Sequence, residues 1–420
     1  MMTKTRSILL FLLLSLLVLP LSECPAMPKV DRIVLENNLT LLVFEDHSIP
    51  AVTIHLLVKA GSWRDPGGAE GVANLTARST LLGTRNLSFS RINDRLDYLG
   101  ANLNAECGKD SSTIGMQVLK KELDSGFDLL LEVITGASFP EAEVAREKEN
   151  VLGRIRSQED QPIQIANKAF EKALFLNSPY ARDLEGTVES LAGVGPEALA
   201  KFYDSFYRPN NAIMVIGGDI TSDEVKSRLV PKLLGWKPAK IPELAYVSAF
   251  AQGTVTVMID KPFSQATVVI GSPAFERSHK DYYALAVMNH ILGSGGLNSR
   301  LMTEVRIKAG LAYAVESVLL ARKHSGSFRI LLQTQNSSAG EAIALVAREL
   351  ERMQQEPVSE AELELAKKFL IGNFPLRFSD TQGDYAKFLA QVEFYGLGTD
   401  YPEQYPSIIN AITARDILRV

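Results

Sequence analysis

Glu141-Ala142-Glu143-Val144 opens a predicted long helix, and Glu360-Ala361-Glu362-Leu363 opens a second one in the other half of the chain. The match continues inside both helices at the same offset, where Gly153 of the first corresponds to Gly372 of the second. A single repeat of about half the chain is typical of a duplicated domain, whereas arrays of short repeats have periods of about 20–50 residues. The sequence therefore predicts two homologous domains.

Each half combines predicted strands and helices. In the first half, residues 30–35, 40–44 and 52–58 alternate apolar with polar side chains, which is typical of strands in one sheet. The elements that follow are predicted as helices at 70–82 and 89–99, strands at 101–106 and 112–119, helices at 121–135, 140–175 and 194–207, and a strand at 212–216. This order favours an α+β fold, in which each domain has a mixed, mostly antiparallel sheet packed against helices, over a doubly wound parallel sheet.

The same patterns set the predicted domain boundaries. Residues 27–234 form the N-terminal domain, 235–251 a linker with two prolines and little periodicity, and 252–420 the C-terminal domain. The chain stops inside the helix that corresponds to 194–207, before any equivalent of the strand at 212–216. We therefore expect the second domain to be truncated at its C-terminus, with a natural short form as the alternative.

Residues 1–26 have the layout of a secretory signal peptide. Lys4 and Arg6 precede an apolar run at 8–19, and a cleavage position after Ala26 follows it. A helix of this length reaches roughly 18 Å, short of the ~30 Å hydrocarbon core of a membrane. The sequence predicts an exported, periplasmic or envelope-associated protein with no transmembrane span in the mature chain. A lipid anchor at Cys24 is less favoured, because a glutamate precedes it where lipoprotein signals have a small residue.

The composition excludes several classes of protein and site. Lys and Arg number 44 against 49 Asp and Glu, a formal net charge of −5, so no basic excess is present for binding nucleic acid. Two cysteines, Cys24 and Cys107, among 420 residues exclude a disulfide framework and a cysteine-rich zinc site. We expect Cys107 to be a buried, inert thiol. No two histidines have metal-ligand spacing on a helix, and we expect packing or surface positions for His47, His55, His279, His290 and His324.

Three ordered groups of residues resemble the pitrilysin and mitochondrial-processing-peptidase family of zinc peptidases, the inverzincins with H-x-x-E-H on a helix. They are Gly61-Ser62-Trp63-Arg64-Asp65 with Gly71-Val72-Ala73 and Gly83-Thr84; Ser178-Pro179-Tyr180 with Tyr207-Arg208-Pro209-Asn210-Asn211; and Gly293-Ser294-Gly295-Gly296 with Ser299-Arg300-Leu301, Glu304-Val305-Arg306 and Gly310-Leu311-Ala312-Tyr313. The resemblance covers nearly all of the chain after the leader. It implies the LuxS/MPP-like metallohydrolase fold, with two similar domains in each chain.

The metal-binding positions of that family are changed in this chain. The family's two histidines, its glutamate base and its distal glutamate ligand fall on Asn74, Arg78, Ala77 and Arg154 respectively. Zinc needs two imidazoles and a carboxylate at about 2.0–2.2 Å, and catalysis needs a base for the bound water. Asn74 is a poor ligand, Ala77 offers no base, and two arginines repel a dication. The resemblance thus implies a degenerate metal site and no cofactor in this chain.

A second set of family positions is kept. Arg306 and Tyr313 flank Gly310, where a helix from about residue 299 ends and a strand at 312–319 begins. Both side chains can point into one cleft and donate hydrogen bonds to a developing oxyanion, which lower a barrier by roughly 2.7–4 kcal/mol each. In the family, the matching pair is understood to bind the substrate carbonyl. A solvated ion pair for the arginine and a core position for the tyrosine are the alternatives.

Small residues precede this pair in the sequence. We predict a substrate-binding or partner-facing loop there, because residues without bulky side chains let another backbone approach closely. A helix end followed by a simple turn is the alternative. The loop consists of Gly293, Ser294, Gly295 and Gly296.

A lost metal site beside a kept carbonyl-binding pair implies half of an active site. The resemblance suggests the non-metal-binding subunit of a heterodimeric zinc endopeptidase, inactive alone, that encloses unfolded or short peptides with an H-x-x-E-H partner. The partner would supply zinc and base, and this chain Arg306, Tyr313 and half of the chamber. An inert scaffold of the same fold is the first alternative. A hydrolase with an unrelated catalytic arrangement is the second.

Overall fold

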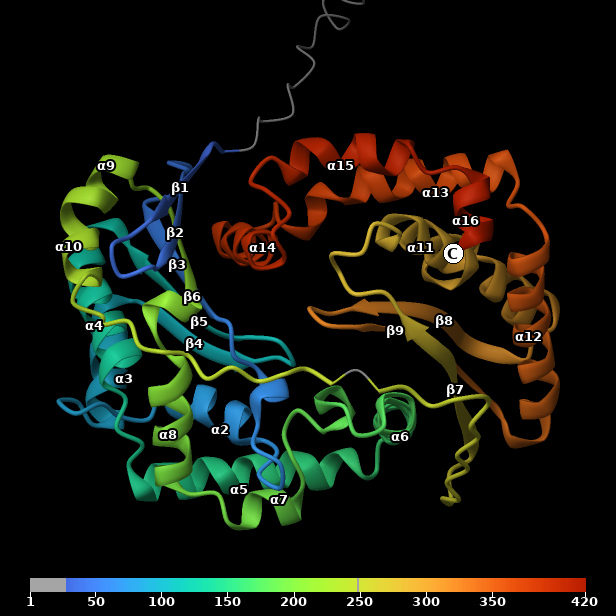
Figure 1. The fold of residues 1–420 in the computed structure, drawn as a ribbon, viewed down its shortest axis with the longest axis horizontal. Helices are drawn as coiled ribbons and strands as arrows, with labels where there is room; N and C mark the ends of the chain where they lie inside the picture. Colours follow the sequence, from blue (N-terminus) through green and yellow to red (C-terminus); the bar gives the residue numbers. More distant parts are fainter. Residues whose placement is uncertain (1–27, 248) are drawn as a thin grey trace, which may run out of the picture.

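The computed structural model describes residues 28–247 and 249–420. The predicted leader, its cleavage position and Cys24 therefore lie outside the described residues. Within them the strands form two sheets, one in each half of the sequence, and Figure 1 shows the sheets facing each other across the middle of the molecule.

The first sheet contains six strands in the order β1-β2-β6-β3-β5-β4. All neighbours are antiparallel except β2 and β6, which run parallel. The strands are β1 (Val30–Val34), β2 (Thr40–Glu45), β3 (Ala51–Val58), β4 (Asn102–Cys107), β5 (Ser112–Leu119) and β6 (Ala212–Gly218). The central strands β3 and β6 are buried along their whole length, which is expected only where both faces of a sheet are covered.

One face of this sheet is covered by helices of the first half. These are α2 (Val72–Ser79), α3 (Phe89–Leu99), α4 (Leu123–Gly136), α5 (Glu141–Gln158), α7 (Val188–Ala192) and α8 (Pro196–Phe206), followed after β6 by the short turns α9 (Ser222–Glu224), η5 (Val225–Leu229) and α10 (Val230–Leu233). The apolar sides of these helices and of the strands form one continuous core. Short 3-10 turns, η1 (Ser62–Arg64), η2 (Lys120–Glu122), η3 (Pro179–Ala181) and η4 (Pro209–Asn211), join them.

Two predicted helices differ from the structure. The helix expected at 140–175 is two helices, α5 and α6 (Pro162–Phe175), because Pro162 has no N–H to continue the hydrogen-bond ladder and disfavours helical backbone in the residue before it. The helix expected at 70–82 is shorter, since Gly71 has a φ of 97° and cannot be part of a right-handed helix.

The second half repeats part of this order of elements around a three-stranded antiparallel sheet, β7-β9-β8. Its elements are β7 (Gln265–Ala274), α11 (Tyr282–Asn289), η6 (His290–Ser294), η7 (Gly296–Asn298), η8 (Met302–Lys308), β8 (Ala312–Ala321), β9 (Gly326–Gln335), η9 (Asn336–Ser338), α12 (Ala339–Gln355), α13 (Glu360–Asn373), η10 (Pro375–Arg377), α14 (Gln382–Tyr395), α15 (Tyr401–Asn410) and α16 (Ala414–Arg419). A mixed, mostly antiparallel sheet in the first half and an antiparallel sheet in the second, each packed against helices, confirm the predicted α+β class. The truncation of the second domain stays a prediction.

Each half also covers the sheet of the other. Helix α14 of the second half packs across β3 and β6, where its buried side chains join those of the first sheet in one core. Helix α6 of the first half packs on β7, and Phe170 reaches Gly271. Figure 1 shows α14 beside the first sheet and α6 below β7. Helix α6 follows α5 as α14 follows α13, so two equivalent helices are exchanged between the halves.

Candidate functional site

The first motif, Gly61 to Asp65, supplies hydrogen-bond acceptors to the N-terminus of helix α2. The Asp65 carboxylate accepts hydrogen bonds from the backbone N–H groups of Gly71, at 2.8 Å, and Ala73, at 2.7 Å. Both groups belong to the helix N-terminus, where N–H groups lack intrahelical partners and favour negative charge. Burial raises the pKa of Asp65 to about 7, and these two hydrogen bonds act in the opposite direction. Asp65 therefore serves as a remote cap of the helix that carries three of the four degenerate metal positions.

The degenerate metal positions lie on two helices in contact, α2 and α5. Asn74 and Ala77 are buried on α2, and the Asn74 Oδ1 atom finds no hydrogen-bond donor among the described residues. Arg78 on α2 donates to Glu147 of α5. Arg154 on α5 donates to Glu185 at 2.9 Å. Two ion pairs thus hold the guanidinium groups of the two arginines that the sequence predicts at ligand positions.

These four residues do not fit zinc. No imidazole or carboxylate stands at any of them, and Glu147 and Glu185, the nearby carboxylates, are engaged by arginine. Among residues 28–247 and 249–420, no group of three or more His, Cys, Asp or Glu is arranged to hold a metal ion. Neither glutamate is among the site residues predicted from the sequence. Glu147 stands two helical turns before Arg154 on the same helix, and that spacing is the signal that could have identified it.

Each histidine of the described residues has its own local surroundings. His47 is exposed and bonds to Asp219 at 2.6 Å, which raises its pKa, whereas burial on β3 lowers the pKa of His55 to about 4. The remaining three stack on aromatic rings, His279 on Phe275, His290 on Phe369 and His324 on Tyr246. Cys107 is half-buried rather than fully buried as predicted, and burial raises the pKa of its thiol to about 12, which favours the protonated form.

Arg306 and Tyr313 meet in the structure. The Arg306 guanidinium carbon lies 5.0 Å from the centre of the Tyr313 ring. Gly310 lies between them with a φ of 67°, which reverses the chain from η8 into β8. Tyr313 is 80% exposed, so the alternative of a core aromatic is wrong for this side chain.

Tyr313 is placed by a β-bulge. Ala312 pairs with Thr334 and Ala314 pairs with Gln333, so Tyr313 is an extra residue without a partner in the ladder. The hydroxyl of Thr334 donates to the carbonyl of Leu311 at 2.5 Å and fixes the backbone just before the bulge. Bulges redirect side chains and are common beside active sites. The local structure therefore aims the phenol away from the core and under the arginine.

The small-residue loop packs next to this pair. It spans the end of η6 and the start of η7, which contact β8 and η8 respectively. A Cβ atom on Gly293 would lie 2.5 Å from the backbone nitrogen of Ser317 in β8, and one on Gly295 would lie 2.7 Å from the carbonyl oxygen of His290. Ser294 and Gly296 are exposed. Two of the glycines are thus required by contacts within the chain, and the predicted contact of the loop with substrate or partner stays a prediction.

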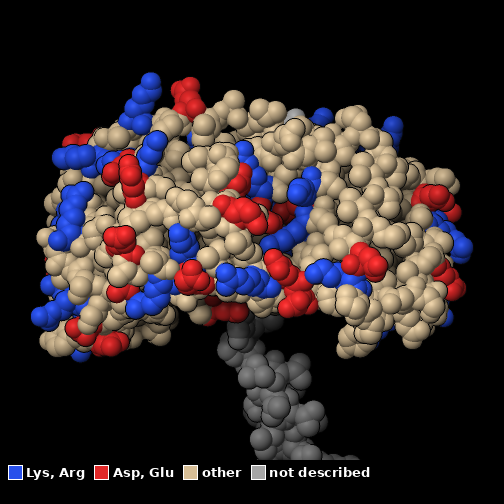
Figure 2. All heavy atoms as spheres, turned by 90° about the horizontal axis from the view of Figure 1, so that it is seen from below, with Lys and Arg blue, Asp and Glu red and all other residues tan. Residues whose placement is uncertain are grey.

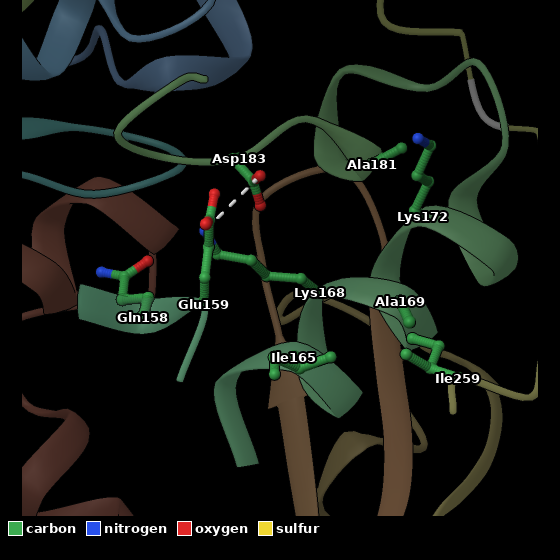
Figure 3. Close-up of a pocket in the computed structure, with 9 residues that line it drawn as sticks. All are labelled: Gln158, Glu159, Ile165, Lys168, Ala169, Lys172, Ala181, Asp183 and Ile259. Carbon is green, nitrogen blue, oxygen red and sulfur yellow. Dashed lines mark ion pairs between the residues drawn. The ribbon is translucent and has the colours of Figure 1, made fainter. Parts of the chain in front are cut away.

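A cavity of about 250 Å³ lies elsewhere, between the end of α5, helix α6 and the segment after η3 (Figure 3). Lys168 and Asp183 form an ion pair across it, with nitrogen and oxygen 3.6 Å apart. Basic, acidic and apolar side chains line this cavity, and they do not form a set of donors or acceptors suited to one kind of ligand. Neither Arg306 nor Tyr313 is among the lining residues. We assign it no role in the predicted site.

The surface carries charges of both signs. On the face shown in Figure 2, basic and acidic side chains are interspersed and neither sign covers a continuous area of the described residues.

None of the helices in the described part of the chain is both long and apolar enough to cross a membrane.

Comparison with known proteins extends over both halves. Residues 41–188 match the model of insulinase (peptidase family M16), and residues 193–370 match the model of the peptidase M16 inactive domain. A crystal structure of a peptidase M16 inactive domain from Pseudomonas fluorescens superposes with a TM-score of 0.86 at 26% identity and covers 93% of each chain.

Two of the proteins similar in sequence illustrate the range of descriptions. An uncharacterized zinc protease of Rickettsia bellii is 24% identical over 395 residues and covers 92% of both chains. The non-peptidase homolog YmxG of Helicobacter pylori is 28% identical over 334 residues, which are 79% of this chain and 77% of that protein. Similar proteins thus include one described as a protease and one described as a non-peptidase.

Proposed function

Because this chain belongs to peptidase family M16, whose two models together match most of its length, we propose that it is the non-metal-binding subunit of a heterodimeric zinc endopeptidase. Its own residues would bind the substrate carbonyl, and a homologous H-x-x-E-H subunit would supply the metal and the base. The chain by itself is then catalytically inactive.

The observation that carries this proposal is the contrast between the two halves. In the first half, ion pairs occupy the metal positions through Arg78 and Arg154. In the second half, Tyr313 stands exposed on a bulge with Arg306 over its ring. An exposed phenol beside a cation is a pair of hydrogen-bond donors ready for a carbonyl oxygen that gains negative charge.

The partner completes the site and the enclosure. A chain that binds a carbonyl but cannot activate water depends on a second chain that places a metal opposite Arg306 and Tyr313. Two such chains would enclose an unfolded or short peptide between them, and their interface should exceed roughly 1,000 Å². The leader at 1–26 supports export to the periplasm or envelope as the place of action.

Co-expression with the H-x-x-E-H homologue of the same organism tests this proposal. We expect a stable complex that contains zinc only in the homologue and cleaves a disordered peptide, whereas the isolated chain binds no tightly held zinc and cleaves nothing. About one zinc per isolated chain after chelation and re-addition would overturn the proposal. So would a chain that stays monomeric in the presence of the homologue. A stable but proteolytically silent complex supports the alternative of an inert scaffold.

A further inference from the structure

The two halves meet at equivalent hairpin turns. The strands β8 and β9 of the second half correspond to β4 and β5 of the first, because each pair precedes the helix that opens with the repeated motif. That helix is α5 in the first half and α13 in the second. The β8–β9 turn at 322–325 is therefore the counterpart of the β4–β5 turn at 108–111. In the structure these turns touch. The contact is distinct from the apolar packing of α14 on the first sheet, because it consists of hydrogen bonds, charges and ring stacking.

Hydrogen bonds from the backbone of one turn cross to the first half. The N–H of Lys323 donates to Asp110 Oδ2 at 2.9 Å, and the N–H of His324 donates to the hydroxyl of Tyr180 at 3.4 Å. Tyr180 in turn donates to the other carboxylate oxygen of Asp110. Asp110 and Tyr180 are both buried, so loss of the turn would leave these groups with fewer partners.

Aromatic rings hold the His324 side chain. Its ring centre lies 4.8 Å from that of Tyr246, with the planes 14° apart, and 4.7 Å from that of Trp63. The Tyr246 hydroxyl also contacts the Ser325 hydroxyl at 2.9 Å. Trp63 belongs to the first motif and Tyr246 to the predicted linker, so two separate segments form one socket for this imidazole.

The socket disfavours a charged imidazole. Burial is the largest influence on the pKa of His324 and lowers it. Asp110 and Glu276 act to raise this pKa, and Lys323 and Arg64 act to lower it. The Arg64 guanidinium already lies 4.0 Å from the centre of the Trp63 ring. An imidazolium would therefore approach a ring that already carries a cation.

Apart from Glu276, which accepts a hydrogen bond from the Ser278 hydroxyl at 3.2 Å, the charged groups around the turn are already paired. Arg322 donates to Glu171 at 2.6 Å, and Lys109 lies 3.7 Å from the same carboxylate. The carboxylate of Asp110 accepts from both Tyr180 and Lys323. Tyr180 and Tyr246, whose pKa values are raised by burial, remain neutral. None of these groups offers an unengaged carboxylate to a protonated His324.

We propose that the turn at 322–325 is a pH-sensitive latch between the two halves, closed around neutral His324 and released when this imidazole takes up a proton. Release separates the tips of the two hairpins, while α14 keeps its apolar contact with β3 and β6. A histidine whose pKa is lowered in the closed state stabilises that state at pH values above the ordinary histidine pKa. That stabilisation is lost progressively as the pH falls below the ordinary value of 6.5.

Hydrogen exchange at single-residue resolution on the full chain tests the latch. The amides of Lys323 and His324 report the closed state because their acceptors lie in the first half. The Arg322 amide donates within the turn to Ser325 and serves as the internal reference. Between about pH 7.5 and about pH 5, we expect the protection of Lys323 and His324 relative to Arg322 to fall, by at most about 30-fold.

Three variants identify the titrating group. His324→Phe keeps a stacking ring that cannot take up a proton, so its relative protection should not change with pH. His324→Gln should also be independent of pH if the phenylalanine variant folds poorly. His290→Phe is the matched control, because His290 is buried and burial lowers its pKa as it does that of His324, and the variant should behave as the wild type. Equal protection of the wild type at both pH values, or an unchanged pH dependence in His324→Phe, would overturn the latch.

Discussion

At the scale of single residues, the proposed binding of the substrate carbonyl can be tested at Tyr313 and Arg306. Tyr313→Phe removes one hydroxyl from an exposed position, so folding should be unaffected. If the phenol donates mainly in the transition state, kcat/KM of the reconstituted peptidase falls by about 10²–10³-fold. Arg306→Ala should be at least as severe, because it also removes a charge. Steady-state kinetics on complexes of confirmed stoichiometry and zinc content measure both effects.

A matched control is available in this chain. Tyr98 on α3 is 86% exposed, and Tyr98→Phe removes the same hydroxyl from a surface far along the sequence from the predicted site. It should leave kcat/KM unchanged. Unaltered kinetics in both Tyr313→Phe and Arg306→Ala would favour the inert scaffold over the carbonyl-binding subunit.

The residues of the candidate site could be named from the sequence, whereas their surroundings could not. Asn74, Ala77 and Arg78 lie inside an ordered motif that resembles the family, and Arg154 falls on the family's distal ligand position in the long helix. Their counter-charges could not be named, since Arg78 bonds to a glutamate 69 residues away and Arg154 to one 31 residues away. The bulge at Tyr313 was equally hidden, because a bulge is defined by the pairing with β9 and not by the local pattern.

At the scale of elements, helix α2 depends on a residue outside it. Asp65→Ala removes the acceptor of two backbone N–H groups at the helix start and leaves them buried. Loss of a helix cap costs about 0.5–2 kcal/mol, and we expect the free energy of unfolding to fall by that amount. Chemical denaturation monitored by circular dichroism measures the change. Asp97→Ala, near the end of the solvated helix α3, is the control that should have no such effect.

The positions of helices were less predictable at their ends than in their middles. The apolar spacing from residue 140 to 175 fits one helix, and the structure divides it because of a single proline. Pro162 was visible in the sequence, but a proline in a helical pattern either kinks a helix or starts a new one. The contact of α6 with β7 selects the second outcome here, since the new helix turns toward the other half.

At the scale of the whole molecule, the exchange of α6 and α14 makes each half depend on the other. The sequence did not indicate this, because residues 40–44 and 52–58 were predicted as alternating strands, whereas β2, β3 and β6 are buried on both faces and require two covering layers. The sequence could not show which element forms the second layer. That layer is α14, which lies in the other half of the chain and reaches the sheet only through the packing of the complete protein.

Separating the halves tests this dependence. A fragment of residues 28–247 loses α14 and exposes the apolar side chains that it covers, Leu42, Phe44, Leu57, Ile213 and Val215. Each is worth about 1.5–3 kcal/mol of burial, so together they approach the total stability of a typical domain, about 5–15 kcal/mol. We expect the fragment to bind a hydrophobic dye and to unfold without a cooperative transition.

Co-expression with residues 249–420 should restore a compact complex with a single transition, because the second fragment returns α14 to β3 and β6 and receives α6 on β7. A fragment 28–247 that is monomeric, excludes the dye and melts at the temperature of the full chain would show instead that the first half is an independent domain and that the exchanged helices only position the halves.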